Sequence, residues 1–126
     1  MKLLNDFFFL EKTTVTEDGT CDALRLNPQH AIFQAHFPGN PITPGVCIIQ
    51  MVAELLEHHT GRSLSLKQAV NVKFLHVLSP REQTTCRVVF HSLESDGLVW
   101  KIKASVEAGK TRFAQLSMIF ENGPKV

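Results

Sequence analysis

The chain has 126 residues, of which 44% are hydrophobic, and its 13 basic and 12 acidic side chains give a net charge of +1. This length corresponds to one ordinary domain, and the hydrophobic share is sufficient for a folded core, which excludes a disordered chain. The balanced charge gives no reason to expect nucleic acid as a partner, because nucleic-acid-binding proteins usually present a strongly basic face.

The three cysteines are far apart in the sequence and show no metal-ligand spacing. We therefore expect free thiols in a reducing compartment, without a zinc site or a disulfide framework. The apolar start of the chain is interrupted by Asn5 and Asp6 and is too short for a signal peptide or a membrane span. These features favour a cytoplasmic protein that has no membrane association and no bound metal.

Two β-rich segments are predicted first, at residues 6–16 and 20–27, separated by the turn-forming sequence Glu17-Asp18-Gly19. The next stretch, residues 28–45 (PQHAIFQAHFPGNPITPG), contains four prolines and two glycines. Proline fixes φ and lacks an N–H donor, so this stretch is expected to be a loop of defined shape rather than a helix interior or a central strand.

A helix is predicted after this loop. Thr43 suits an N-cap, Pro44 suits the first helical position, and Gly61 suits the C-terminal stop. Apolar residues cover most sides of this helix, which indicates that it is buried; they are Val46, Ile48, Ile49, Val52, Ala53, Leu55 and Leu56.

Three polar residues of this helix, Gln50, Glu54 and His58, recur every four positions and therefore share one face. A solvent-facing stripe is the simplest explanation for Glu54 and His58. It suits Gln50 less well, because Gln50 lies in the most apolar part of the helix.

The remaining sequence predicts four strands, at residues 68–78, 84–93, 98–107 and 111–120. The third has a clean period of two, in which Trp100, Ile102, Ala104 and Val106 alternate with Lys101, Lys103, Ser105 and Glu107. Turn-forming residues separate the last three strands, as hairpins require. One buried helix and six antiparallel strands predict an α+β fold in which a curved sheet wraps around the helix.

The most specific pattern of the chain is HFPGNPITPGVCIIQMVAE, from His36 to Glu54. It resembles the signature of the 3-hydroxyacyl-carrier-protein dehydratase family of the hotdog superfamily, in which HFPG-x-P-x-x-PGV precedes the central helix. Every gap of that signature is preserved here. The segment VKFLHVLSPREQ, Val72 to Gln83, is similar to the strand and proline-containing turn of the family. The resemblance implies a single hotdog domain over residues 1–126, with about six antiparallel strands around a central helix.

In that family the histidine removes a proton from C2 of a 3-hydroxyacyl thioester. The resemblance gives this role to His36, and an imidazole is suited to it because it titrates near neutral pH. It gives Gly45 the backbone N–H that binds the thioester oxygen, at a helix N-terminus where developing negative charge is stabilised. The acyl chain is expected to contact apolar residues of the loop and the first helical turns, namely Phe33, Phe37, Pro44, Val46, Ile48 and Ile49. No cofactor is implied, because the phosphopantetheine arm arrives on the carrier protein as part of the substrate.

The chain departs from the family on the central helix, where a carboxylic acid normally stands fourteen positions after the histidine. That position is Gln50 here, and Glu54 stands one turn later, where the family commonly has glutamine. Glutamine resembles glutamate in shape but has no acidic proton to give to a departing hydroxide. The loss of one general acid typically costs ~10²–10⁴-fold in rate.

Three functions are compatible with this exchange. In the first, which we favour, the chain is a lyase that dehydrates a 3-hydroxyacyl thioester on acyl carrier protein to the trans-2-enoyl thioester, in fatty-acid or polyene-type lipid biosynthesis. His36 would then return the C2 proton to the leaving oxygen, or Glu54 would supply the acid. In the second, the chain is a catalytically impaired, acyl-thioester-binding partner subunit of a heteromeric dehydratase. The third is a hotdog thioesterase, a class that generally lacks the HFPG motif in this form.

The resemblance also implies partners. Hotdog proteins generally work as dimers, so we expect a homodimer or higher oligomer, or a heterodimer with a paralogue, in which His36 of one chain faces Gln50 and Glu54 of the other. The stretch from His58 to Arg81 has no carboxylate but carries Arg62, Lys67, Lys73 and Arg81. It is a candidate docking surface for an acidic acyl carrier protein, and Lys73 and Arg81 are the positions to test.

Overall fold

The computed structural model describes residues 2–35 and 39–123, so His36 and Phe37 lie outside the described residues. Within these ranges the strands are β1 (Phe8–Thr16), β2 (Gly19–Leu26), β3 (Leu64–Phe74), β4 (Thr85–Ser95), β5 (Val99–Ala108) and β6 (Thr111–Asn122). The helices are α1 (Ala31–Ala35) and α2 (Gly45–Thr60). No helix in these two ranges has the length and apolar content needed to cross a membrane.

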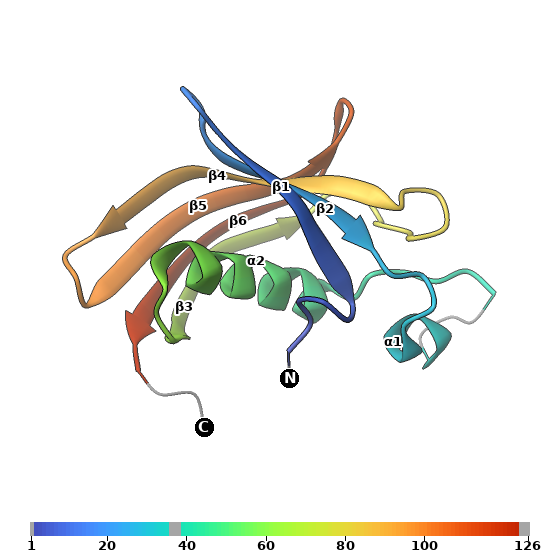
Figure 1. Ribbon diagram of the computed structural model, residues 1–126, viewed down its shortest axis with the longest axis horizontal. Coiled ribbons are helices and arrows are strands. Elements are labelled where there is room, and N and C mark those ends of the chain that lie inside the picture. The colour runs from blue at the N-terminus through green and yellow to red at the C-terminus, as the bar shows by residue number, and fades with distance from the viewer. Residues whose placement is uncertain (1, 36–38, 124–126) are drawn as a thin grey trace.

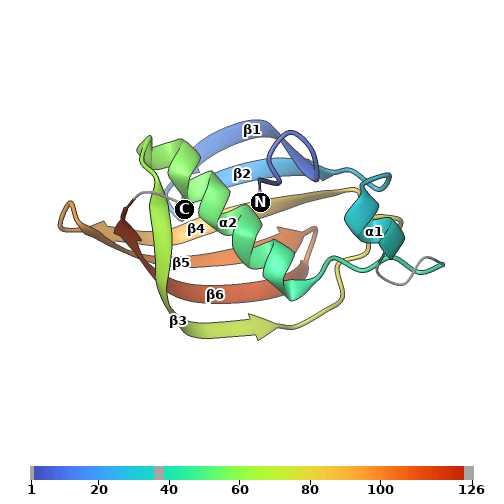
Figure 2. The ribbon, with the colours of Figure 1, turned by 90° about the horizontal axis from the view of Figure 1, so that it is seen from below.

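The six strands form one antiparallel sheet in the order β1-β2-β4-β5-β6-β3. The sheet is curved and α2 lies across its concave side (Figures 1 and 2). The core lies between them, where Met51 and Leu55 of α2 and Val106 and Ala114 of the sheet are completely buried. This arrangement confirms the predicted α+β hotdog fold.

The two ends of α2 differ in how well the sequence predicted them. Pro44 is the N-cap residue, with an extended backbone (φ −61°, ψ 145°), and its carbonyl accepts the N–H of Cys47 at 3.0 Å. Thr43 as N-cap is therefore wrong, and its buried hydroxyl has no hydrogen-bond partner among the described residues. Gly61 ends the helix as predicted, in the left-handed conformation (φ 68°) with its N–H donating to the Glu57 carbonyl at 2.8 Å.

The helix α1 lies inside the stretch expected to be an irregular loop, so that expectation is wrong for residues 31–35. No proline or glycine occurs from residue 29 to residue 37, which leaves the backbone able to form a helical turn. His30 begins the turn, because its Nδ1 accepts the N–H of Ile32 at 3.0 Å. Phe33 is 1% exposed and stacks on Phe7, with ring centroids 4.6 Å apart, which holds the turn on the core.

The strand β3 begins and ends earlier than the predicted residues 68–78. It pairs with β6 from Leu64 opposite Asn122 to Phe74 opposite Ala114, and two irregularities interrupt the register. Because these irregularities break the alternation of side chains, periodicity could not locate the ends of this strand. The other five strands end close to their predicted positions.

The alternation predicted for β5 is confirmed on its inner side, where Ile102, Ala104 and Val106 are buried. Ser105 was expected on the polar outer side, yet it is only 1% exposed. Its hydroxyl donates to the Glu107 carboxylate and is 2.8 Å from His91 Nε2, so a polar network covers it on the outer face of the sheet.

Candidate active site

A pocket of about 300 Å³ lies where α2 begins and where the chain leaves β3. Its wall is formed by Ile42, Thr43, Gly45, Ile48, Phe74, Leu75, His76, Val77 and Leu78. Gly45 and Ile48, which the sequence assigned to the substrate site, thus border one pocket. The wall is mainly apolar, and the start of a helix adds backbone N–H groups to it.

The ring of Phe74 lies against Gly45. A β-carbon at position 45 would lie 2.7 Å from Phe74 Cζ, so glycine is the residue that fits without displacing the ring. The first N–H groups of a helix have no intrahelical carbonyl partner, and the N-terminus carries partial positive charge. The pocket wall at Gly45 therefore offers the kind of donor that stabilises negative charge on a thioester oxygen.

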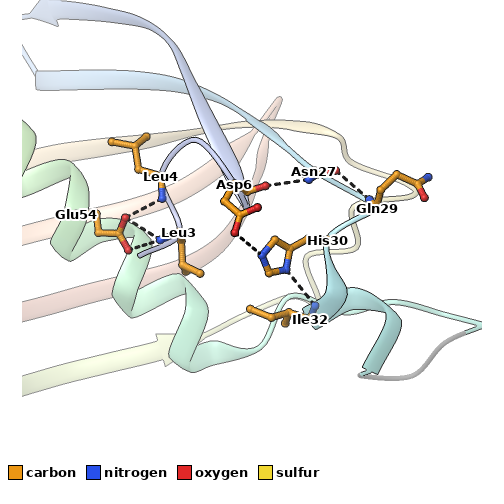
Figure 3. Close-up of polar contacts among 8 residues, drawn as sticks. All are labelled: Leu3, Leu4, Asp6, Asn27, Gln29, His30, Ile32 and Glu54. Atoms are coloured by element: carbon orange, nitrogen blue, oxygen red, sulfur yellow. Dashed lines mark hydrogen bonds and ion pairs between the residues drawn. The ribbon is translucent and has the colours of Figure 1, made fainter. Parts of the chain in front are cut away.

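Gln50 and Glu54, whose residue types are exchanged relative to the family pattern, are hydrogen-bonded to each other. Gln50 Nε2 donates to Glu54 Oε2 at 2.8 Å. Glu54 is only 5% exposed, so the solvent-facing position predicted for it is wrong. Figure 3 shows the cause: the chain start lies against α2, and the backbone N–H groups of Leu3 and Leu4 donate to the carboxylate at 2.7 to 3.0 Å.

The same N-terminal segment also contacts the chain just before α1 (Figure 3). The Asp6 carbonyl accepts Asn27 Nδ2 at 2.9 Å, and Asp6 Oδ2 is 3.1 Å from His30 Nε2. Since His30 Nδ1 accepts the N–H of Ile32, Nε2 is the nitrogen that donates to Asp6. His30 therefore connects the chain start to the helix that precedes residue 36.

On the other side of His36, the motif is held by Arg81. Arg81 Nη1 donates to the Gly39 carbonyl at 2.7 Å. Each flank of the motif is thus tied to a distant part of the chain, the first through His30 and the second through Gly39. The sequence assigned Arg81 to carrier docking and gave no indication of this contact.

The other residues assigned to substrate binding have different surroundings. Phe33 lies in the core against Phe7, Val46 is 67% exposed on the first turn of α2, and Pro44 and Ile49 are half-buried. None of the four lines the pocket at the start of α2. Their assignment to the acyl chain remains a prediction.

His76 is a pocket residue that the sequence did not identify. It stands alone between apolar residues, and no spacing or motif distinguishes it. Its position follows from the path of the chain after β3, where the N–H of Leu75 donates to the Phe113 carbonyl at 2.8 Å. The imidazole adds a hydrogen-bonding side chain to a wall that is otherwise mainly apolar.

Comparisons with known sequences converge on one family. Residues 12–114 match the model of a family described as ApeI-like, ApeI dehydratase. The 3-hydroxyacyl-(acyl-carrier-protein) dehydratase FabZ of Latilactobacillus sakei is 33% identical over 98 residues, which cover 72% of this chain and 70% of that protein. FabZ of Caulobacter vibrioides is 30% identical over 105 residues, which cover 74% of this chain and slightly less than two thirds, 65%, of that protein.

Solved structures agree on the fold. The dehydratase heterocomplex ApeI:P from Xenorhabdus doucetiae has a chain that matches with a TM-score of 0.70 at 18% identity, over 90% of this chain and 97% of that chain. An uncharacterized protein from Erwinia carotovora matches with a TM-score of 0.57 at 22% identity, over 92% of this chain and 93% of that chain. At these identities the similarity establishes the fold and not the chemistry.

Proposed function

Because the chain belongs to the ApeI-like dehydratase family, we propose that it dehydrates a 3-hydroxyacyl thioester on acyl carrier protein to the trans-2-enoyl thioester. The observation that carries this proposal is the intact HFPG-x-P-x-x-PGV motif, which leads into a pocket with Gly45 in its wall. The mainly apolar wall suits an acyl chain. We place the reaction in fatty-acid or polyene-type lipid biosynthesis.

In the reaction that we propose, His36 acts as the only proton carrier. Its imidazole takes the proton from C2, and the electron pair of the broken C2–H bond forms the second bond between C2 and C3 as the C3–O bond breaks. The imidazolium then gives its proton to the departing oxygen, so that water leaves and the imidazole is neutral again. Backbone N–H groups at Gly45 hold the thioester oxygen, on which negative charge develops.

The contacts of Glu54 support this one-base scheme over a scheme in which Glu54 is the acid. Both carboxylate oxygens accept hydrogen bonds, from the backbone of Leu3 and Leu4 and from Gln50. A proton on Glu54 would face these N–H donors instead of a substrate oxygen. The role that we propose for Gln50 is a hydrogen bond to the 3-hydroxyl group of the substrate, because that role needs no proton transfer.

We also propose that two chains assemble through β3, as a homodimer or with a paralogue. In the described sheet β3 stands at one end of the strand order, so one of its edges has no partner strand there. Large apolar side chains are exposed along this edge and beside it, namely Leu66, Val70, Phe74, Leu75, Val77 and Val46. Pairing of two β3 edges would cover them and complete the pocket at Gly45. A monomeric mass in light scattering at micromolar concentration would contradict this assembly.

Acyl carrier protein is the partner that we propose for the basic stretch. Lys73 is exposed on β3 and precedes Phe74 of the pocket wall, and Arg81 is exposed after β3. Because Arg81 also holds Gly39, Lys73→Glu is the cleaner test. It should weaken carrier affinity at low salt and leave activity on a carrier-free thioester unchanged. Unchanged carrier affinity after reversal of both charges would reject this surface.

The state of the cysteines supports a reducing location, and we propose the cytoplasm. Cys21, Cys47 and Cys86 are all free thiols. Burial raises the pKa of the Cys86 thiol to about 12 and raises the pKa of the other two as well. Thiols with raised pKa values are weak nucleophiles, so a structural role suits them better than a redox role.

Intact mass spectrometry of a 3-hydroxyacyl carrier protein tests the proposed function. Wild type should remove one water and keep the thioester, whereas His36→Ala should leave the mass unchanged. Release of the free carrier thiol would instead identify a thioesterase. No change with wild type alone, followed by loss of water when a paralogue is added, would identify the chain as a partner subunit.

A further inference from the structure

The ring of Phe74 stands beside the backbone donor that the proposed reaction uses. Phe74 is the last residue of β3, Gly45 is the first residue of α2, and both belong to the wall of one pocket. A β-carbon built on Gly45 would lie 2.7 Å from Phe74 Cζ and 2.8 Å from Cε2, so the far end of the ring lies against this glycine. The ring therefore fills the space that a side chain at position 45 would take.

The backbone holds this ring in place. Phe74 pairs with Ala114 of β6, and the next residue, Leu75, donates its N–H to the Phe113 carbonyl at 2.8 Å. The N–H of His76 lies 3.4 Å from the same carbonyl. These contacts fix the end of β3 on β6, and a phenyl ring is planar and rigid. The contact with Gly45 is thus a fixed feature of the pocket wall.

Substrate atoms held at Gly45 come close to this ring. The thioester oxygen and C2 are two bonds apart, because both are bonded to the carbonyl carbon. When the Gly45 N–H holds the oxygen at an ordinary hydrogen-bond distance of about 2.9 Å, C2 is also brought close to the glycine. Among the described residues outside the helix backbone and the chain neighbours of Gly45, the three heavy atoms nearest to its β-carbon position all belong to Phe74. A group attached to C2 therefore competes with the ring for space.

We propose that Phe74 is a specificity-determining residue that admits 3-hydroxyacyl thioesters with an unbranched C2 and rejects those with a methyl group at C2. This inference rests on the proposed dehydration and names its substrate class. Chemistry alone does not impose the selection, because a C2 atom that carries a methyl group still has one hydrogen. His36 takes that hydrogen as a proton, the electron pair of the C2–H bond forms the second C2–C3 bond, and the oxygen leaves with the C3–O pair and the returned proton as water. The selection is steric, so a smaller side chain at position 74 should relax it.

The first arm of the test measures kcat/KM of wild type for a matched pair of carrier-free substrates. They are the 3-hydroxybutyryl and 3-hydroxy-2-methylbutyryl thioesters of pantetheine, which differ by one methyl group, and both configurations at C2 are assayed. A hydrophobic pocket discriminates one such group by about 10–200-fold, and wild type should favour the unbranched substrate by a factor in this range. Equal values of kcat/KM for the two substrates would overturn the inference.

The second arm assigns this preference to the ring. Phe74→Leu should lower the preference by about tenfold, mainly by raising kcat/KM for the methyl-branched substrate, and Phe74→Ala should lower it further. Phe74 is 51% exposed, so these variants remove little of the core. Leu66→Ala is the matched control, because Leu66 is on the same strand, is 44% exposed and is not among the described residues that line this pocket. It should keep the wild-type preference.

Two results of the second arm would contradict the inference. One is a preference that stays at the wild-type value in folded Phe74→Leu and Phe74→Ala. The other is an equal loss of preference in Leu66→Ala, which would attribute the effect to the exposed edge of β3 and not to the ring beside Gly45.

A further readout needs no turnover. The butyryl and 2-methylbutyryl amides of pantetheine keep the carbonyl oxygen but have no 3-hydroxyl group to lose. In calorimetry, wild type should bind the branched amide at least about tenfold more weakly than the unbranched one, and Phe74→Leu should bring the two affinities together. This result with a wild type that removes no water from either thioester would reject the proposed function and leave the steric selection established. Loss of water from both thioesters with no effect of position 74 would reject the inference and leave the proposed function standing.

Discussion

Two buried carboxylates stabilise the position of α2, one near its middle and one near its end. They accept hydrogen bonds from different kinds of donor. Glu54 is held mainly by backbone N–H groups of residues 3–7, which we call the strap. Asp22 on β2, which is 0% exposed, is held by two side chains: Thr13 Oγ1 donates at 2.7 Å and His59 Nε2 lies at 2.6 Å. Each partner of Asp22 can be removed by a point mutation, whereas the backbone donors of Glu54 persist under almost any substitution.

The two carboxylates therefore differ in role: Asp22 connects elements of the fold, whereas Glu54 contacts Gln50, which we assign to the substrate site. Asp22 ties β1, β2 and the last turn of α2 together, through Thr13 and His59. Glu54 stands one turn from Gln50 and accepts a hydrogen bond from its amide at 2.8 Å. We therefore expect changes at Asp22 to affect stability alone, and changes at Glu54 to affect both stability and turnover.

The largest effect is expected for Glu54→Leu. Removal of the carboxylate leaves the two strap N–H groups buried without their acceptor, and each such group costs about 1–3 kcal/mol. The free energy of unfolding in urea should fall by about 3 kcal/mol, and kcat should fall with it. A loss below about 1 kcal/mol, the net value of one ordinary hydrogen bond, would show that water replaces the carboxylate and that the strap is not fixed by it.

A smaller effect is expected for Asp22→Asn, about 2 kcal/mol, because the amide loses the charge-assisted contact with His59 but keeps an acceptor for Thr13. Urea unfolding gives the free energy, and a double-mutant cycle with Thr13→Val isolates the side-chain pair. For folded Asp22→Asn the kcat of dehydration should equal that of wild type. A lower kcat would abolish the distinction between the two carboxylates.

Glu107 gives a third, more exposed comparison, with an effect of about 1 kcal/mol. Its partial burial raises its pKa, but the hydrogen bond from Ser105 and the charges of Arg112 and Arg87 outweigh this, so its pKa lies below the ordinary value. A carboxyl with a lowered pKa stabilises the fold above its unfolded pKa, about 4.3, and this contribution disappears as pH falls through the folded value. Thermal unfolding should thus separate wild type from Glu107→Gln at pH 7 and not at about pH 3. A constant difference at both pH values would exclude the ionised carboxylate as its cause.

The smallest change concerns Cys86, which reports on local opening without altering stability. It lies on β4 opposite Leu24, next to the pair of Asp22 and Val88. Because burial raises its pKa to about 12, alkylation at pH 8 should be slow and should require opening of the strand. Mass spectrometry should detect faster labelling in Asp22→Asn than in wild type. The same acceleration in Glu54→Gln would mean that both carboxylates stabilise one cooperative unit.

Most of the fold was predictable because it depends on local patterns. Period-two alternation located β5, and a glycine located the end of α2. The burial of Glu54 was not predictable, because its partners Leu3 and Leu4 are about fifty residues away and contribute only backbone atoms, which leave no trace in the sequence. The helix α1 was not predicted, because the four prolines of residues 28–45 indicated a loop, although residues 29–37 contain no proline or glycine.

The candidate site was likewise predictable only where it depends on a contiguous stretch of sequence. The motif from His36 to Val46 is contiguous, so its spacing could be matched directly to a family. The contact of Arg81 with Gly39 and the place of His76 in the pocket wall depend on how the chain returns after β3, and a single sequence does not specify that path. Charge patterning therefore assigned Arg81 to docking alone.

The pH dependence of kcat/KM for a 3-hydroxyacyl carrier protein tests the central claim most directly, since the claim is that His36 is the only proton carrier while Glu54 stays an acceptor. We predict a profile with one ascending limb, near the histidine range of about 6.5, followed by a plateau, because the same imidazole takes and returns the proton. A bell-shaped profile with a descending limb in the wild type would require a second group that acts as an acid and would contradict the account.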